Sequence, residues 1–122
     1  MQLSTLLVAI MAATASATCH KSGDTWNNKA AARSAVTSAC TGRGRFTGTF
    51  LVDEIRRICV NSGGNQKMEF EVQNKGGEPR NWDNAECIYR LNNEIDGCRE
   101  NMGGYNNVDN WSYGADPNAG RC

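Results

Sequence analysis

A segment near the C-terminus combines the side chains that proteins use to bind sugars. The segment GGYNNVDNWSYGADPN, residues 103–118, places aromatic rings among Asn and Asp side chains. Aromatic faces pack against the apolar C–H side of a sugar ring, and amide and carboxylate groups exchange hydrogen bonds with adjacent hydroxyls. We expect Trp111 and Tyr113 to stack on a ligand and Tyr105 to flank them. The predicted ligand-binding residues are Tyr105, Asn107, Asn110, Trp111, Tyr113 and Asp116.

The same segment has a second interpretation, in which Trp111 packs into the core and the asparagines only turn the chain. Asn110-Trp111-Ser112 also matches the acceptor sequence for N-glycosylation. A glycan attached there would compete with a ligand site, so both alternatives stay open.

The titratable residues argue against an enzyme. A ribonuclease needs a general acid and a general base on either side of a phosphate, and His20 is the only histidine. Glu69 with Arg57 across a hairpin is conceivable, but alternating charges are typical of a strand face in water. A glycosidase needs two carboxylates, one in a dry pocket, and the sequence predicts wet faces or helix caps for Glu54, Glu69, Glu71, Glu86 and Glu94.

A Ser-His-Asp triad also lacks support, since only His20 supplies an imidazole and no nucleophile-elbow motif is present. We therefore predict a non-catalytic protein without a cofactor. A small ribonuclease-like hydrolase is the third-ranked hypothesis.

The cysteines predict a disulfide framework. An even number of cysteines in a small secreted domain indicates disulfides. No CxxC pair occurs, so no zinc site is expected. Cys87 and Cys98 lie on one predicted helix, about 16 Å apart at the helical rise. Disulfide Cα atoms lie at most about 7 Å apart, so these two pair elsewhere, and the connectivity is otherwise open. The expected disulfide cysteines are Cys19, Cys40, Cys59, Cys87, Cys98 and Cys122.

The first residues predict a secretory signal. An apolar run from Leu6 to Ala13 ends at Ala15-Ser16-Ala17, the small-x-small pattern of a cleavage site. The run is too short to span a bilayer, which needs roughly 20 apolar residues. We expect a signal peptide over 1–17, a single cysteine-rich domain over 18–122, and a secreted, extracellular protein.

The formal net charge of +0 argues against a nucleic-acid partner, which usually requires a basic excess.

Two helices and several strands must position these residues. Helical spacing predicts a first helix over about 25–40 with Asp24 as its N-cap. A second helix follows Asp83, because Glu86 three residues on makes a capping-box-like start. Its apolar stripe runs from Cys87 through Leu91 and Ile95 to Cys98.

Alternation of apolar and polar residues predicts a strand over Met68 to Val72, with Ile55 to Val60 as its hairpin partner. Another strand is expected within Phe46 to Val52, and one around Trp111 to Tyr113. The fold class is therefore α+β: a small, disulfide-stabilised α/β sandwich with two helices packed on an antiparallel sheet.

The last half of the chain resembles a known family. CIYRLNNEIDGCRENMGG (87–104), followed by a tryptophan and by DPNAGRC (116–122), resembles the fungal glycan-binding proteins with a Y-three-like domain, typified by the shaggy ink-cap protein. The upstream CVN and FEVQN strands are also similar, so the match covers roughly 55–122. The resemblance implies an α/β sandwich, extracellular location and binding of glycans with terminal N-acetylgalactosamine or fucose. It also implies no cofactor and no enzymatic step.

The resulting hypothesis is a secreted lectin-like protein whose partners are oligosaccharides or glycoproteins. The alternative is a secreted cysteine-rich toxin or host-directed effector that binds a protein or membrane target. The oligomeric state is left open.

Overall fold

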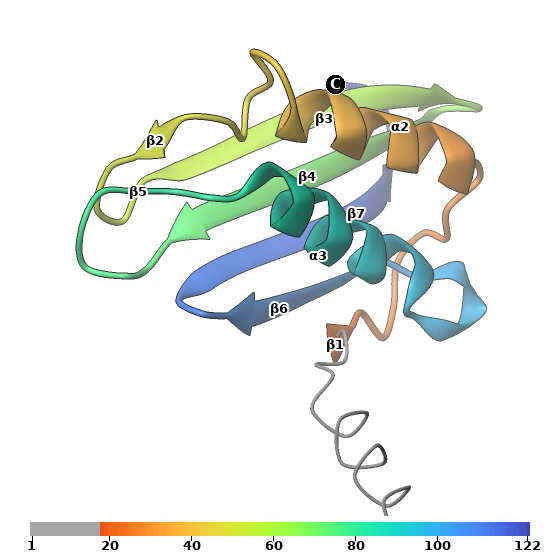
Figure 1. The fold of residues 1–122 in the computed structure, drawn as a ribbon. Coiled ribbons are helices and arrows are strands. Elements are labelled where there is room, and N and C mark those ends of the chain that lie inside the picture. The colour runs from red at the N-terminus through yellow and green to blue at the C-terminus, as the bar shows by residue number, and fades with distance from the viewer. Residues whose placement is uncertain (1–17) are drawn as a thin grey trace, which may run out of the picture.

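Two helices cover one face of an antiparallel sheet and leave the other face open. The computed structural model describes residues 18–122, and the predicted signal peptide lies outside this range. Figure 1 shows both helices in front of the sheet, with the strands running behind them. The predicted fold class, a disulfide-stabilised α+β sandwich, is confirmed. Among residues 18–122, neither helix has the length and apolarity needed to cross a bilayer.

The main sheet has five strands in the order β1-β6-β7-β4-β3, and all neighbours are antiparallel. The predicted hairpin is confirmed, with two glycines of positive φ in its turn. Glycine adopts this conformation without a Cβ penalty. The strand bounds are Thr18–Cys19 for β1, Ile55–Gly63 for β3, Gln66–Asn74 for β4, Gly104–Val108 for β6 and Trp111–Ala119 for β7.

The first helix starts later than predicted. Helix α2 spans Lys29–Cys40, and its N-cap is Asn28, whose side chain accepts from the backbone N–H of Ala31. Asp24 is therefore not the cap. The preceding segment is held outside the helix because Trp26 is buried and donates its backbone N–H and indole Nε1–H to carbonyls far along the chain.

The second helix is confirmed. Helix α3 spans Asn84–Asp96, and the Asp83 side chain accepts from the backbone N–H of Glu86 as a capping residue does. Cys87, Leu91 and Ile95 are buried on the stripe that faces the sheet. A short 3-10 helix, η1, spans Arg99–Asn101 and leads into β6.

The predicted strand over Phe46 to Val52 is shorter than expected. Only Thr49–Phe50 (β2) is extended, and it pairs with Arg80–Asn81 (β5) in a separate two-stranded sheet. Gly48 has a positive φ just before β2, so the chain turns there and cannot join the main sheet as a longer strand.

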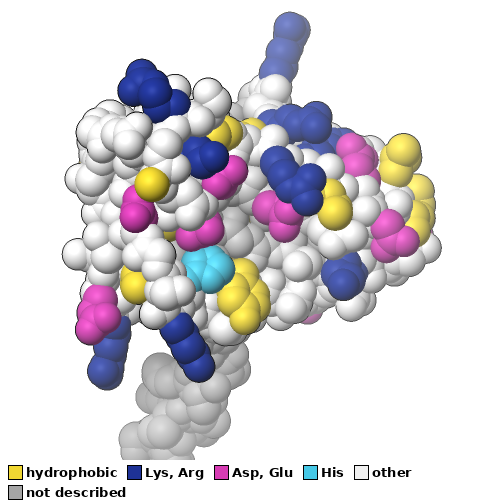
Figure 2. Space-filling view, turned by 180° about the vertical axis from the view of Figure 1, so that it is seen from behind, with side chains coloured by type: hydrophobic (Ala, Val, Ile, Leu, Met, Phe, Trp, Pro, Cys, Tyr) yellow, Lys and Arg dark blue, Asp and Glu magenta, His cyan; other side chains and the backbone are white. Residues whose placement is uncertain are grey.

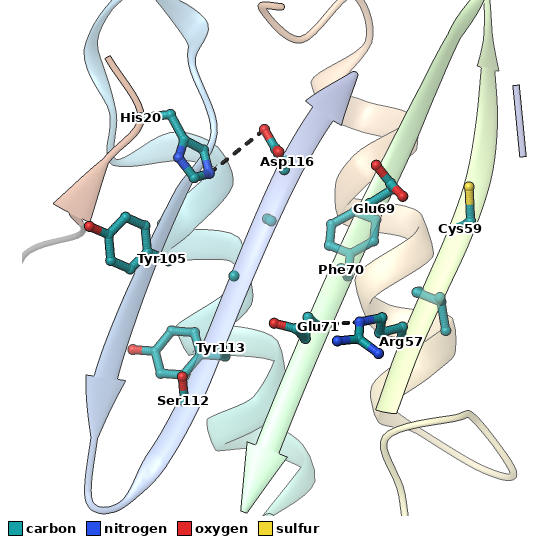
Figure 3. Close-up of a pocket in the computed structure, with 13 residues that line it drawn as sticks. His20, Arg57, Cys59, Glu69, Phe70, Glu71, Tyr105, Ser112, Tyr113 and Asp116 are labelled. Atoms are coloured by element: carbon teal, nitrogen blue, oxygen red, sulfur yellow. Dashed lines mark hydrogen bonds and ion pairs between the residues drawn. The ribbon is translucent and has the colours of Figure 1, made fainter. Parts of the chain in front are cut away.

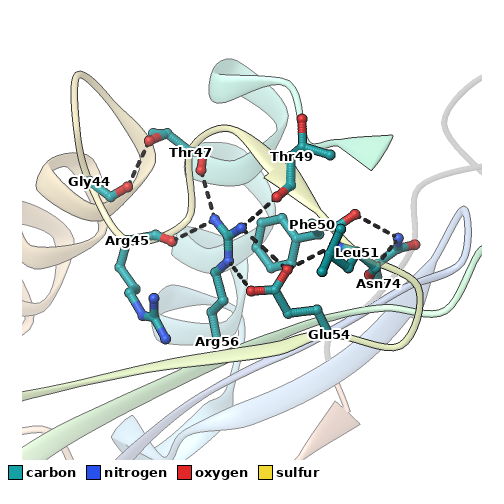
Figure 4. A network of polar contacts seen from close by, with 9 residues as sticks. All are labelled: Gly44, Arg45, Thr47, Thr49, Phe50, Leu51, Glu54, Arg56 and Asn74. Atoms are coloured by element: carbon teal, nitrogen blue, oxygen red, sulfur yellow. Dashed lines mark hydrogen bonds and ion pairs between the residues drawn. The ribbon is translucent and has the colours of Figure 1, made fainter. Parts of the chain in front are cut away.

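An arginine holds this corner of the molecule together (Figure 4). The Arg56 guanidinium donates to the Glu54 carboxylate at 2.9 Å and to the Thr47 carbonyl, and it lies over the Phe50 ring, 4.1 Å from the centroid. The hydrogen bond from Arg56, together with the backbone N–H of Leu51, lowers the pKa of Glu54. Arg56 is therefore a structural residue of this corner.

Three disulfides join the two layers and the ends of the chain. Cys19 pairs with Cys98, Cys40 with Cys87, and Cys59 with Cys122. The six-cysteine framework and the separate partners of Cys87 and Cys98 are thus confirmed. Three disulfides in a domain of this size are typical of extracellular proteins.

The strand expected around Trp111 to Tyr113 is confirmed and is longer than predicted. Residues 104–119 form a hairpin, and β7 is the middle strand of the main sheet. Asp116-Pro117-Asn118 lies within β7. Proline is tolerated there because β7 extends past the end of β6: the last β6 pairing joins Gly104 to Ala115, so the Pro117 nitrogen has no β6 residue opposite it.

Candidate functional site

The sheet face turned away from both helices carries a hollow, and we call this surface the open face. Strand alternation sends every second side chain there, and Figure 2 shows acidic, basic and histidine side chains gathered around a depression on it. The hollow has a volume of about 670 Å³. The polar and aromatic side chains that line it on the open face are His20, Arg57, Glu69, Glu71, Tyr105, Ser112 and Asp116.

Gly114 forms the floor of the hollow. In the sheet register it is the partner of Tyr105 on one side and of Glu71 on the other. Because glycine has no side chain, the space between the tyrosine and the glutamate stays open (Figure 3). Tyr105 is 48% exposed and forms one wall.

His20 is fixed at the rim of this hollow by its neighbours. The Cys19–Cys98 disulfide anchors the preceding residue, and the His20 backbone N–H donates to the Gly103 carbonyl at 2.9 Å. Its Nε2 lies 3.7 Å from Asp116 Oδ1, and its ring centroid lies 5.6 Å from that of Tyr105. The His20 imidazole therefore lies between the Tyr105 ring and the Asp116 carboxylate.

Two carboxylates share one amide donor on the open face. Asn118 Nδ2 donates to Glu69 Oε1 at 2.7 Å and to Asp116 Oδ2 at 3.1 Å. Glu69 and Asp116 are also directly opposite each other in the β4–β7 register. Lys67 Nζ lies 4.0 Å from Glu69 Oε2, at the limit of an ion pair. Both carboxylates line the hollow and are more than two-fifths exposed, so a ligand can donate to them.

Arg57 and Glu71 form a surface ion pair beside these carboxylates. Arg57 Nε donates to Glu71 Oε2 at 2.7 Å, and the two residues are partners across the hairpin. The sequence suggested Glu69 as the partner of Arg57, which is wrong because Glu69 lies opposite Cys59. Both side chains are more than half exposed, so this pair can rearrange around a ligand.

The structure corrects two of the predicted ligand-binding residues. Trp111 is 5% exposed and Tyr113 3%, because odd-numbered β7 side chains point toward the helices. Trp111 stacks on Trp82 at 5.3 Å, and the Arg80 guanidinium covers its ring at 4.4 Å. The expected stacking of these two rings on a sugar is therefore wrong, and the core-packing alternative for Trp111 holds.

The other four predicted residues are accessible but do not form one cluster. Tyr105 and Asp116 line the hollow. Asn107 is exposed further along β6, outside the lining of the hollow, and Asn110 is exposed in the β6–β7 turn. The structure thus brings together one predicted aromatic residue and one predicted carboxylate.

One buried carboxyl group lies on the opposite side of the sheet. Glu94 on α3 is fully buried, which corrects the expectation of a wet face. Within the described chain neither of its carboxyl oxygens nor the Tyr113 hydroxyl finds a hydrogen-bond partner. Burial raises the pKa of Glu94 to about 7. Burial, with the nearby Glu94, also raises the pKa of Tyr113 to about 12.

Sequence reasoning missed most of the open face. It considered His20, Arg57 and Glu69 only as weak catalytic candidates, and it did not single out Asn118. The alternation around Glu69 and Glu71 did predict a wet strand face. The missing information was that β7 pairs with β4, which brings Asp116 and Asn118 beside that face.

Comparisons with known proteins give no relative from which the function of this site could be inferred. No protein-family model, curated protein or solved structure matches the chain. Over the range 18–122, no group of three or more His, Cys, Asp or Glu side chains is arranged to hold a metal ion. The open face therefore offers hydrogen-bonding groups, one aromatic ring and mixed charges.

Proposed function

We propose that this protein binds glycans in the hollow of the open face and does not process them. The observation that carries the proposal is a half-exposed Tyr105 ring across a glycine floor from a row of carboxylates. A sugar ring presents an apolar face on one side and hydroxyl donors around its edge. The tyrosine would contact the first and the carboxylates would accept from the second.

The rigidity of the site supports binding. The lining residues lie on paired strands, and His20 is tied to the Cys19–Cys98 disulfide. A preorganised site loses little conformational entropy when a ligand binds. The volume of about 670 Å³ is also within the usual range of small-molecule pockets.

The glycan class comes from the sequence resemblance. Oligosaccharides ending in N-acetylgalactosamine or fucose are the first ligands to test, as free sugars or on glycoproteins. Secretion fits this proposal, since glycans are displayed outside cells and the three disulfides require oxidising conditions.

A glycan array tests the proposal. We expect saturable binding by the oxidised protein and loss of that signal in Gly114→Val, whose side chain would fill the floor of the hollow. A Cβ added at Gly114 lies 3.3 Å from both the Gly104 carbonyl oxygen and the Tyr105 Cβ, a close contact that requires these neighbours to shift by a few tenths of an ångström. Circular dichroism should show an intact fold. An array signal no stronger than that of the reduced protein, or unchanged binding by Gly114→Val, would contradict the proposal.

Cleavage of RNA is the second candidate. His20 and Glu69 flank Asp116 on the open face, and the exposed Arg57 guanidinium lies nearby, so an acid, a base and a phosphate-binding group share one hollow. The charge balance weighs against it, because three carboxylates of the lining repel a polyanion. Release of nucleotides from RNA that is lost in both His20→Ala and Glu69→Gln would favour this candidate over glycan binding.

A further inference from the structure

We propose that the open face prefers sugars that carry a free amino group, and so binds cationic glucosamine-type oligosaccharides more tightly than their N-acetylated counterparts. This inference rests on the proposed glycan-binding function and names the ligand class of the same site.

The charges that line the hollow do not cancel. Glu71 is matched by Arg57 at 2.7 Å. Glu69 and Asp116 have only longer contacts of this kind, with Lys67 Nζ at 4.0 Å from Glu69 and His20 Nε2 at 3.7 Å from Asp116. The lining holds three carboxylates against Arg57 and His20, so it keeps a negative excess, which attracts a cation and repels a sulfated or phosphorylated glycan.

Glu69 and Asp116 are placed to hold one ammonium group. Glu69 Oε1 and Asp116 Oδ2 both reach the same Asn118 Nδ2 atom. The distance between these two oxygen atoms therefore cannot exceed the sum of the two hydrogen-bond lengths. An ammonium group has three donors and forms charge-assisted hydrogen bonds with carboxylates, so it can contact both at once.

The two carboxylates repel each other, and a cationic ligand bound between them would relieve this repulsion. Like charges directly opposite each other on neighbouring strands destabilise a sheet, and Glu69 lies opposite Asp116. Both side chains remain more than two-fifths exposed, so a ligand can reach them. An N-acetylated sugar offers an amide N–H here, which carries no charge and satisfies only one acceptor.

Tyr105 directs the sugar so that its amino group meets this pair. Glu71 lies directly across the glycine floor from Tyr105, and Glu69 and Asp116 form the next pair along β4 and β7 (Figure 3). A pyranose ring that packs on Tyr105 and covers Gly114 would present its equatorial substituents toward Glu69 on β4 and Asp116 on β7, which line the same hollow.

Titration calorimetry with two matched ligands tests the inference. The probes are a β-linked glucosamine oligomer and the same oligomer fully N-acetylated, in a near-neutral buffer of low salt. We expect roughly fivefold tighter binding of the amino form, the upper range for an exposed ion pair, and a smaller ratio as salt is added. Asp116→Asn and Glu69→Gln should each reduce the ratio, and the two together should abolish it.

Glu78→Gln is the matched control, because it removes the same charge from an exposed residue outside the hollow. The ratio should be unchanged in this variant. Equal affinity for both oligomers would overturn the amino-sugar inference while leaving glycan binding intact. Binding of neither oligomer, together with a silent glycan array, would overturn both.

Discussion

Burial in the native state disfavours the ionised form of Glu94. It is fully buried without a hydrogen-bond partner in the described part of the chain, and its pKa rises to about 7. The native state therefore favours the neutral acid and binds more protons than the unfolded chain between the ordinary pKa of 4.5 and about 7. Stability is then greatest below this window, falls as pH rises through it and levels off above it.

This linkage predicts a loss of about 3 kcal/mol in the free energy of unfolding between about pH 4 and about pH 8 from Glu94 alone. Glu94→Gln cannot ionise and should lose that much less over the same interval. Urea unfolding with intact disulfides at the two pH values measures the difference. The exposed Glu78→Gln should follow the wild type. An identical pH dependence in wild type and Glu94→Gln would contradict this account, because it would mean that the Glu94 carboxyl group keeps its ordinary pKa in the folded state.

Two of the disulfides join different secondary-structure elements and therefore differ in what they stabilise. Cys40–Cys87 joins α2 to α3 within the helical layer. Cys19–Cys98 joins β1 to the end of α3 and fixes the residue before His20, at the rim of the hollow. The first contributes to stability alone, whereas the second contributes to stability and to the shape of the site.

Replacing either pair by serine should lower the free energy of unfolding by about 2–4 kcal/mol, the typical contribution of a disulfide. Only Cys19→Ser with Cys98→Ser should also weaken glycan binding, because His20 and β1 then lose their anchor. Urea unfolding and glycan binding, measured on both double variants below their unfolding midpoints, separate the two effects. Equal loss of binding in both would mean that the rim does not shape the site.

The elements themselves were largely predictable, because their signals are local. Cys87, Leu91 and Ile95 repeat at helical spacing, and Met68, Phe70 and Val72 alternate. The C-terminal hairpin has the same alternation, with Trp111, Tyr113 and Ala115 facing the core. Only a short strand around Trp111 to Tyr113 was predicted there, because Asn, Gly and Pro are poor strand formers in isolation. Tertiary pairing with β4 overrides that weak local preference.

The site was less predictable, because it depends on which strands are neighbours. Asp116 and Glu69 are far apart in sequence, and only the β4–β7 pairing makes them adjacent. Trp111 attracted attention as the largest ring of the segment, yet strand alternation sends it to the core and leaves Tyr105 outside. Composition thus identified a segment that contributes to the hollow, while topology decided which of its residues are accessible.

For the whole molecule, the central claim is that one face of the sheet binds glycans and the helical face does not. Tyr105 on the open face and Tyr89 on α3 are a matched pair for this test, being 48% and 53% exposed. Neither ring is part of the core, so both alanine variants should fold like the wild type.

The most direct measurement is titration calorimetry of wild type, Tyr105→Ala and Tyr89→Ala with the strongest ligand from the glycan array. We predict that Tyr105→Ala weakens binding by about tenfold, the loss of one aromatic contact of about 1.4 kcal/mol. Tyr89→Ala should bind like the wild type. Unchanged affinity in Tyr105→Ala, or an equal loss in Tyr89→Ala, would contradict the assignment of glycan binding to the open face.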